Sequence, residues 1–212
     1  MMRKLLKTRV PPVLEQNFET WTANYLADAN NQTYRYRYRH PDIKNQLRDE
    51  TGNKCVYCES KVGHNTPGDV EHKIPSSVQK RLHFSWDNLT IACTECNRRK
   101  NDYFSDDTPF LDPYVDDVEA CVIHHGPVVG WLAGDECAEV TVSTLQLHDG
   151  TRTELIRRKI ERITELNHVL ARRASTHSET LKQLLTEQLT TMQSVGAEYS
   201  AMVRAVCEHA DG

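Results

Sequence analysis

The stretch from Gly52 to Phe104 reads GNKCVYCESKVGHNTPGDVEHKIPSSVQKRLHFSWDNLTIACTECNRRKNDYF, and its pattern differs from the rest of the chain. Its apolar runs are short and its turn residues are frequent, and a CxxC pair stands near each end. Such a segment cannot bury enough apolar surface to fold alone. We therefore expect a bound metal to contribute to its folding.

The two CxxC pairs are Cys55/Cys58 and Cys93/Cys96. A CxxC loop holds two sulfur atoms about 3.5–4 Å apart, which is one edge of a tetrahedron around zinc. Together these four cysteines predict a structural Zn²⁺ site, with residues 59–92 folded as an insert between its two halves. The alternatives are chance pairs or a redox CxxC. A redox motif would stand as one pair in a thioredoxin-like βαβ context, which is absent here.

Residues inside and just after the insert suggest phosphodiester chemistry. Cleavage needs a base to deprotonate water and a divalent metal on the phosphate. His72 suits the base because an unperturbed pKa of about 6.5 leaves much of it neutral at physiological pH. Glu71 and Asn97 offer the hard oxygen ligands that Mg²⁺ or Mn²⁺ prefers. The basic residues after Asn97 are expected to bind substrate phosphates: Arg98, Arg99 and Lys100.

Each of these residues also has an ordinary interpretation. A single histidine before Lys-Ile-Pro is more often a surface residue, and an asparagine after a CxxC is often a helix cap. Moreover, Glu71 and His72 are adjacent, and adjacent residues of a regular strand face opposite sides. They can share a site only where the strand ends or bends, which Pro75 makes plausible. Their combination between two CxxC pairs nevertheless favours the functional interpretation.

The order of these motifs, CxxC, Glu-His-x-x-Pro, Asn-Leu and CxxCN-x-x-K, resembles the HNH, or ββα-metal, nuclease module in its zinc-ribbon form. The resemblance covers about residues 52–104. It implies that His72 is the general base and Glu71 the acidic metal ligand. It also implies that Asn88 braces the active-site loop through its backbone, and that Asn97 holds the metal at the last motif position. The commonest family pattern has Asp where this chain has Glu71.

Several phrases along the chain resemble the small HNH nuclease subunit of Septu-type anti-phage systems, which is also found with some retrons. They are KCVYCE at 54–59, EH at 71–72, WDNL at 86–89 and FLDP at 110–113, followed by a helical tail. The resemblance implies a role in bacterial defence and a partner ATPase of the ABC/SMC-like class.

Outside this core the apolar spacing predicts mainly helices. One is expected over 13–29 and another from Pro41 to about Glu50, where Pro suits the first helical turn. Short strands at Val118–His124 and Val128–Leu132 would form a hairpin. In the last third, the apolar residues of Leu155–Leu170 and Leu181–Val203 predict two long helices with a break at Ser175–Ser178.

The expected fold class is α+β, with a small ββα-metal HNH core stapled by a four-cysteine zinc site, N-terminal helices and a long helical C-terminal region. The expected divisions are an N-terminal helical region (1–51), the nuclease core (52–104), an acidic linker with short strands (105–150) and the C-terminal helical region (151–212).

Composition limits the location of the chain. No apolar run reaches the 18 or so residues of a membrane span. The basic N-terminus is followed by Pro11 and Pro12 instead of an apolar segment, so a secretory signal is not expected and the cytoplasm is the default. Seven cysteines are an odd number, which argues against a closed disulfide framework.

The formal net charge is −4, but the charge is segregated. Asp102 to Glu119 holds seven acidic residues and no Lys or Arg. Basic residues gather elsewhere, in three clusters: Arg35, Arg37 and Arg39 among tyrosines; Arg98, Arg99 and Lys100; and Arg152, Arg157, Arg158, Lys159 and Arg162. Such segregation creates local positive fields suited to nucleic acid.

We therefore expect a metal-dependent endonuclease that hydrolyses DNA, held mainly by its backbone. One alternative is a catalytically idle, zinc-organised module that binds nucleic acid or protein. Another is an RNA-cleaving toxin nuclease, because the Tyr/Arg alternation at 34–39 could stack on single-stranded bases. A purely structural zinc scaffold would leave Glu71, His72 and Asn97 unexplained. Two loop histidines, His64 and His83, could also contact substrate.

Overall fold

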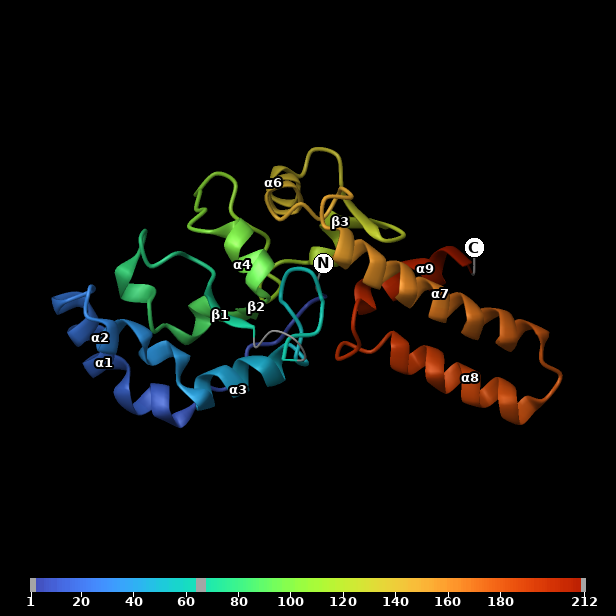
Figure 1. Ribbon diagram of the computed structural model, residues 1–212, viewed down its shortest axis with the longest axis horizontal. Coiled ribbons are helices and arrows are strands. Elements are labelled where there is room, and N and C mark those ends of the chain that lie inside the picture. Colours follow the sequence, from blue (N-terminus) through green and yellow to red (C-terminus); the bar gives the residue numbers. More distant parts are fainter. Residues whose placement is uncertain (1–2, 64–67, 211–212) are drawn as a thin grey trace.

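The computed structural model describes residues 3–63 and 68–210, and it places the cysteine-rich stretch at the centre of the molecule (Figure 1). Strands β1 (Asp69–His72) and β2 (Leu89–Ala92) pair antiparallel, and helix α4 (Thr94–Lys100) contacts β1. The register sets Glu71 opposite Thr90 and His72 opposite Leu89. The α+β class and the small ββα core are confirmed.

The N-terminal helices lie on the side of this core where β1 ends (Figure 1). They are α1 (Pro12–Ala27), α2 (Gln32–Arg35), the 3₁₀ turn η1 (Tyr36–Arg39) and α3 (Pro41–Glu50). Pro12 and Pro41 begin α1 and α3, as the missing N–H and fixed φ of proline favour. The expected helices at 13–29 and 41–50 are confirmed.

Helix α1 also borders the loop between the two strands, and α3 lies against strand β2. This loop carries two 3₁₀ turns, η2 (Lys80–Leu82) and η3 (Trp86–Asn88). Helix α1 contacts η2, and α3 contacts the fully buried strand β2. The loop is therefore contacted by an element from outside the core.

The middle of the chain holds more structure than a linker. Its elements are α5 (Val118–Cys121), β3 (Val122–His125), β4 (Val128–Trp131) and α6 (Glu136–Thr144), and β3 pairs antiparallel with β4. The hairpin is confirmed, but the first strand was expected to begin at Val118, which is wrong. Val118 and Val122 are both buried four residues apart, the spacing of a helical turn. Helix α6 was not expected from the sequence.

The C-terminal third contains α7 (Thr153–Ser175), α8 (Glu179–Met192) and α9 (Ser200–Ala210). The break at 175–178 is confirmed. The expected continuous helix from Leu181 to Val203 is wrong, because residues 193–199 leave the helical path and Tyr199 has φ of +54°. In this interruption, the carbonyls of Val195 and Ala197 accept hydrogen bonds from the Lys54 ammonium instead of from helix N–H groups.

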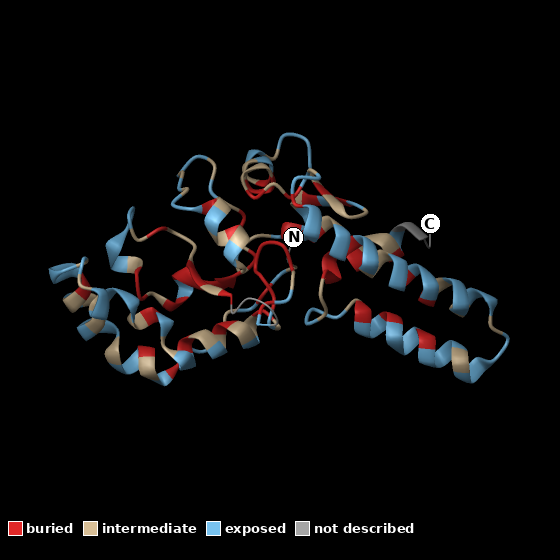
Figure 2. Cartoon of the chain, in the orientation of Figure 1, coloured by how far each residue is buried: buried red, intermediate tan, exposed pale blue. Residues whose placement is uncertain are grey.

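Helices α7 and α8 form an antiparallel pair that projects away from the core (Figure 1). The pair buries residues where its two helices face each other and exposes most of its remaining surface (Figure 2). Within residues 3–63 and 68–210, no helix has the length and apolar character needed to cross a bilayer.

Candidate metal centres and active site

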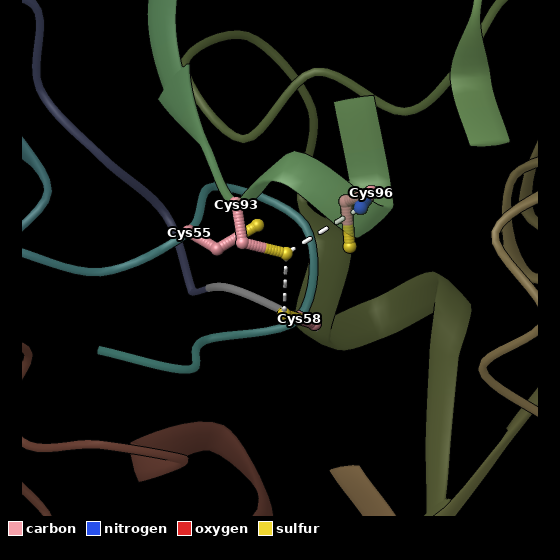
Figure 3. A group of neighbouring side chains, drawn as sticks. All are labelled: Cys55, Cys58, Cys93 and Cys96. Atoms are coloured by element: carbon pink, nitrogen blue, oxygen red, sulfur yellow. Dashed lines mark hydrogen bonds between the residues drawn. The ribbon is translucent and has the colours of Figure 1, made fainter. Parts of the chain in front are cut away.

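Cys55, Cys58, Cys93 and Cys96 come together as the spacing predicts, with their sulfur atoms gathered at one point (Figure 3). All four sulfur atoms lie within 4.8 Å of one another, and those of Cys58 and Cys93 are 3.8 Å apart. Zn–S bonds of about 2.3 Å in a tetrahedron give a sulfur–sulfur edge of about 3.8 Å. The cluster therefore fits a metal ion such as zinc.

The fold brings the two CxxC loops together through the backbone. Val56 N–H donates to Ile91 O at 2.9 Å, which joins the first loop to β2. The second loop begins α4, where Cys93 is the N-cap and its sulfur accepts from Cys96 N–H. Of the His, Cys, Asp and Glu residues in the described chain, only these four cysteines form a group that could hold a metal through three or more such ligands.

Cations from α7 and its N-cap lie beside this cluster. Arg152 Nη1 donates to Cys96 Sγ at 3.2 Å. Lys159 is fully buried. Burial lowers its pKa to about 8, although the negative charges of Cys58 and Glu59 act to raise it. Four thiolates outweigh the charge of one Zn²⁺, so nearby cations stabilise the site. Both residues belong to the third basic cluster, and both are used inside the protein.

The first CxxC loop is also tied to the C-terminal region. Lys54, with no exposed surface, donates to Glu59 at 3.0 Å and to Ala197 O at 2.8 Å. Glu59 in turn accepts from Ser200 Oγ and from Ala201 N–H. This buried network joins Lys54 to Ser200, which lie 146 residues apart in the chain. The C-terminal helices are therefore part of the structure that holds the cysteine cluster.

Glu71, His72 and Asn97 line one cavity of about 490 Å³. His72 is the last residue of β1, so the strand ends where the two adjacent side chains must share a site. Asn97 faces the same cavity from α4. Arg35 and Tyr38 complete one wall from the N-terminal region. The three residues that the motifs predict to act together are thus assembled in the fold.

His72 has a defined tautomer. Its Nε2 lies 2.9 Å from His83 O, and a carbonyl can only accept, so Nε2 carries the hydrogen. The neutral ring therefore keeps the lone pair of Nδ1. Burial and the neighbouring His83 lower the pKa of His72 to about 3, so the ring is neutral at physiological pH. This is the state in which a histidine can accept a proton.

His83 lies behind His72 instead of facing the solvent. The two rings stack with centroids 4.7 Å apart, and Tyr25 stacks on the other face of His83 at 3.9 Å. Nε2 of His83 donates to Arg35 O at 2.7 Å, so its Nδ1 accepts from Ser76 Oγ at 2.6 Å. His83 is only 2% exposed, and burial lowers its pKa to about 4.

From the sequence, His83 is only a candidate for contact with substrate. The sequence does not predict that His83 stacks on His72 and holds it in place. The one signal available is its place beside Phe84 and Trp86, apolar residues typical of a buried loop. The other loop histidine, His64, lies outside the described residues.

Glu71 is 4% exposed and faces Lys100, whose Nζ lies 2.7 Å from Oε1. The Lys100 ammonium also donates to His72 O at 3.0 Å. Burial raises the pKa of Glu71, while Lys100 opposes that rise. Oε1 is buried and already faces the Lys100 ammonium, without a well-aligned hydrogen bond, so this carboxylate favours positive charge beside it.

The basic residues of α4 lie differently from the expected phosphate contacts. Lys100 is 2% exposed and points at Glu71. Arg98 and Arg99 both pair with Glu95, at 2.9 Å and 2.7 Å. Of the three, Arg98 also lines the cavity, and its side chain is exposed. Their charges are thus largely compensated within the protein.

Asn88 braces the active-site loop from within. Its Oδ1 accepts from Ile74 N–H at 2.7 Å, and its Nδ2 donates to Ile74 O at 3.0 Å and Leu82 O at 3.1 Å. It does not line the cavity, and these bonds close the loop that presents His83 O to His72. The arrangement agrees with the bracing role that the motif resemblance implies.

Comparison with known proteins agrees with this geometry. Residues 55–103 match the HNH endonuclease family, so this segment is an HNH endonuclease domain. The chain is 36% identical over 77 residues to the Septu protein PtuB of Bacillus thuringiensis, covering 36% of this chain and 30% of that protein. It is 26% identical over 163 residues to the Septu protein PtuB of Bacillus mycoides (strain KBAB4), covering 62% of this chain and 55% of that protein. The chain thus spans about half or less of the length of these relatives.

Proposed function

We propose that this chain is a metal-dependent endonuclease that hydrolyses phosphodiester bonds of DNA, acting in the bacterial cytoplasm in defence against phage. The observation that carries the proposal is the state of His72. Its Nε2–H is held by His83 O, which leaves the Nδ1 lone pair free to accept a proton, and His72 lines the same cavity as Glu71 and Asn97. A buried, neutral and oriented histidine beside oxygen ligands is the arrangement that water-activating hydrolysis requires.

In the proposed reaction, His72 Nδ1 accepts the proton of the attacking water. A divalent cation, Mg²⁺ or Mn²⁺, would be held by Glu71 and Asn97 and would stabilise negative charge at the scissile phosphate and the leaving oxygen. Lys100 orients this end of β1 through its contacts with Glu71 and His72 O. By resemblance to the family, the products carry 5′-phosphate and 3′-hydroxyl ends.

The cysteine cluster has a separate role in this proposal. Zn²⁺ bound by four cysteines has no open position for substrate and acts in folding. The two CxxC loops flank β1, β2 and the start of α4, the elements that position His72 and Asn97. We therefore assign zinc to the structure and a harder cation to catalysis.

The defence role and the partner rest on similarity. The two relatives are Septu proteins, and the motif order resembles Septu-type nuclease subunits. The expected partner is an ABC/SMC-like ATPase. The α7–α8 pair supports a docked partner, since it projects from the core and exposes most of its surface (Figure 2).

The test is cleavage of plasmid DNA by the zinc-loaded chain, alone and with its co-purified partner, with Mg²⁺ or Mn²⁺ added or withheld. Wild type should cut only with the added cation, and His72→Ala should not cut. His168→Ala is the matched control, because His168 is exposed on α7, and it should cut like wild type.

Each result has a consequence. Cutting by folded His72→Ala would exclude His72 as the base. Failure of every protein to cut, with zinc confirmed and the partner present, would favour the idle binding module. Faster cutting of RNA than of DNA in direct competition would favour the toxin nuclease.

A further inference from the structure

The three basic clusters differ in whether acidic side chains of the protein neutralise their positive charge. Those of α4 and α7 are mostly compensated, although the three cations of α4 share two carboxylates, Glu95 and Glu71. Arg98 and Arg99 pair with Glu95 on their own helix. On α7 the arginines pair with glutamates one turn away, in these combinations: Arg157 with Glu154 and Glu161, Arg158 with Glu154, and Arg162 with Glu165. These two clusters therefore offer little free positive charge to a polyanion.

The cluster at Tyr34–Arg39 is different. None of Arg35, Arg37 and Arg39 forms an ion pair with any residue in the described part of the chain. The nearest acidic residue in sequence, Asp42, lies 3.8 Å from His40. The segment thus presents positive charge that the protein does not neutralise.

These arginines contact aromatic rings instead of carboxylates. The Arg39 guanidinium lies 4.3 Å from the centroid of the Tyr36 ring, and the Arg35 guanidinium lies 5.7 Å from the same centroid. Arg37 turns inward and contacts Trp21 and Tyr34 at 5.8 Å and 5.0 Å. Cation–π contacts orient a guanidinium without cancelling its charge, which leaves its N–H groups available to phosphate oxygens.

The segment is also positioned against the reaction centre. Arg35 and Tyr38 line the cavity that contains His72. The Tyr38 ring meets the His72 ring edge-on at 4.8 Å, and Arg35 O accepts from His83 Nε2. The side chains of Arg35 and Arg39 are exposed. Arg35, whose charge no acidic side chain in the described part of the chain neutralises, and Tyr38 therefore form part of the wall beside the proposed base.

We propose that Tyr34–Arg39 binds the phosphate backbone of the substrate, with Arg35 and Arg39 each contacting a phosphate. The inference deepens the proposed function and depends on it for the identity of the substrate as a polynucleotide. It assigns substrate binding to residues outside the segment that matches the HNH family, 55–103. It also moves that role away from Arg98, Arg99 and Lys100.

The test measures binding without cleavage. The full-length, zinc-loaded chain carries His72→Ala throughout, and no Mg²⁺ or Mn²⁺ is added. Affinity for a fluorescently labelled DNA duplex is measured by anisotropy between about 50 and 300 mM salt, because each phosphate contact adds about 0.9 to the slope of log K against log salt. Arg35→Ala/Arg39→Ala is compared with Arg157→Ala/Arg158→Ala, which removes the same charge from exposed positions on α7.

The expected result is a slope smaller by about 1.8 for Arg35→Ala/Arg39→Ala, and an affinity about 60-fold lower at 0.1 M salt, roughly eightfold for each contact. The α7 variant should keep the parent slope. Equal slopes in all three proteins, an equal loss in both variants, or no binding by the parent at about 50 mM salt would overturn the inference. Circular dichroism of each protein confirms that it is folded.

The outcome is separable from that of the proposed function. Loss of slope in a chain whose wild type never cuts would support the binding site and refute the nuclease. Cutting by wild type with an unchanged slope in Arg35→Ala/Arg39→Ala would do the reverse.

Discussion

Replacement of Asn88 by alanine tests how the loop between β1 and β2 holds the proposed base. Asn88 is buried, and its side chain makes three hydrogen bonds, all to backbone groups of Ile74 and Leu82. None of these contacts involves the cavity surface. The substitution should therefore loosen the loop that presents His83 O to His72, without removing any group that touches DNA.

The magnitude follows from those bonds. Each neutral hydrogen bond contributes about 1 kcal/mol, so Asn88→Ala should lower the free energy of unfolding by about 3 kcal/mol. With a urea dependence of about 2 kcal/mol per molar, the midpoint of unfolding should fall by about 1.5 M. The matched control is Asn167→Ala at an exposed position of α7, which should change stability by less than about 0.5 kcal/mol.

The kinetic effect should be larger on kcat than on KM. A displacement of about 1 Å at the base costs roughly 100-fold in rate, so kcat for DNA cleavage should fall by about that factor while KM changes little. Cleavage is measured under conditions where circular dichroism shows the variant folded. An unchanged kcat in a variant that has lost the expected stability would refute the argument that Asn88 positions His72.

Further predictions concern charge, pH and metal. Lys54→Met should lower the free energy of unfolding in urea by about 3–5 kcal/mol, because it leaves buried Glu59 without its cation. Lys61→Met, at an exposed position, should change that free energy little. Similar losses in both variants would contradict this prediction. The pKa of His83 is lowered to about 4 in the folded state, so the unfolded chain binds more protons between about pH 6.5 and pH 4. Stability should therefore fall on acidification through that window, by up to about 3 kcal/mol from this group, and His83→Gln should show a shallower fall; parallel pH profiles of the two proteins would refute the assignment. A strong chelator should release the metal and increase hydrogen exchange in the first turns of α7, since Arg152 contacts Cys96; release of the metal with α7 still protected would exclude this coupling.

Much of the candidate site could be predicted because its signals are local. The two CxxC pairs define the metal cluster by their spacing, and the cluster forms as expected. Glu71, His72 and Asn97 were identified by their order between and after those pairs, and they line one cavity. Helix boundaries marked by proline, such as Pro12 and Pro41, were also predictable because proline acts on its own backbone.

Other features depended on distant residues and were missed for that reason. Lys100 sits one turn after Asn97, a position that suits a phosphate contact, yet its ammonium is buried against Glu71. The interruption between α8 and α9 follows an apolar pattern that continues a helix. There the carbonyls of Val195 and Ala197 bond to Lys54, more than a hundred residues earlier. Periodicity reports which face of a segment is apolar, and it carries no information about such partners.

By itself, then, the amino-acid sequence determined the chemistry that is available: four thiolates for a metal, a histidine with two oxygen ligands, and a set of basic clusters. Tertiary structure alone decided which of those groups are free to act. Ion pairs within α4 and α7 neutralise most of the positive charge of these two helices, whereas the arginines of Tyr34–Arg39 contact aromatic rings. It also decided the tautomer of His72, since Nε2 meets a carbonyl eleven residues away in the chain. The physical reason is that a protonation state or an uncompensated charge depends on what surrounds a group in space, and the sequence specifies those surroundings only through the complete fold.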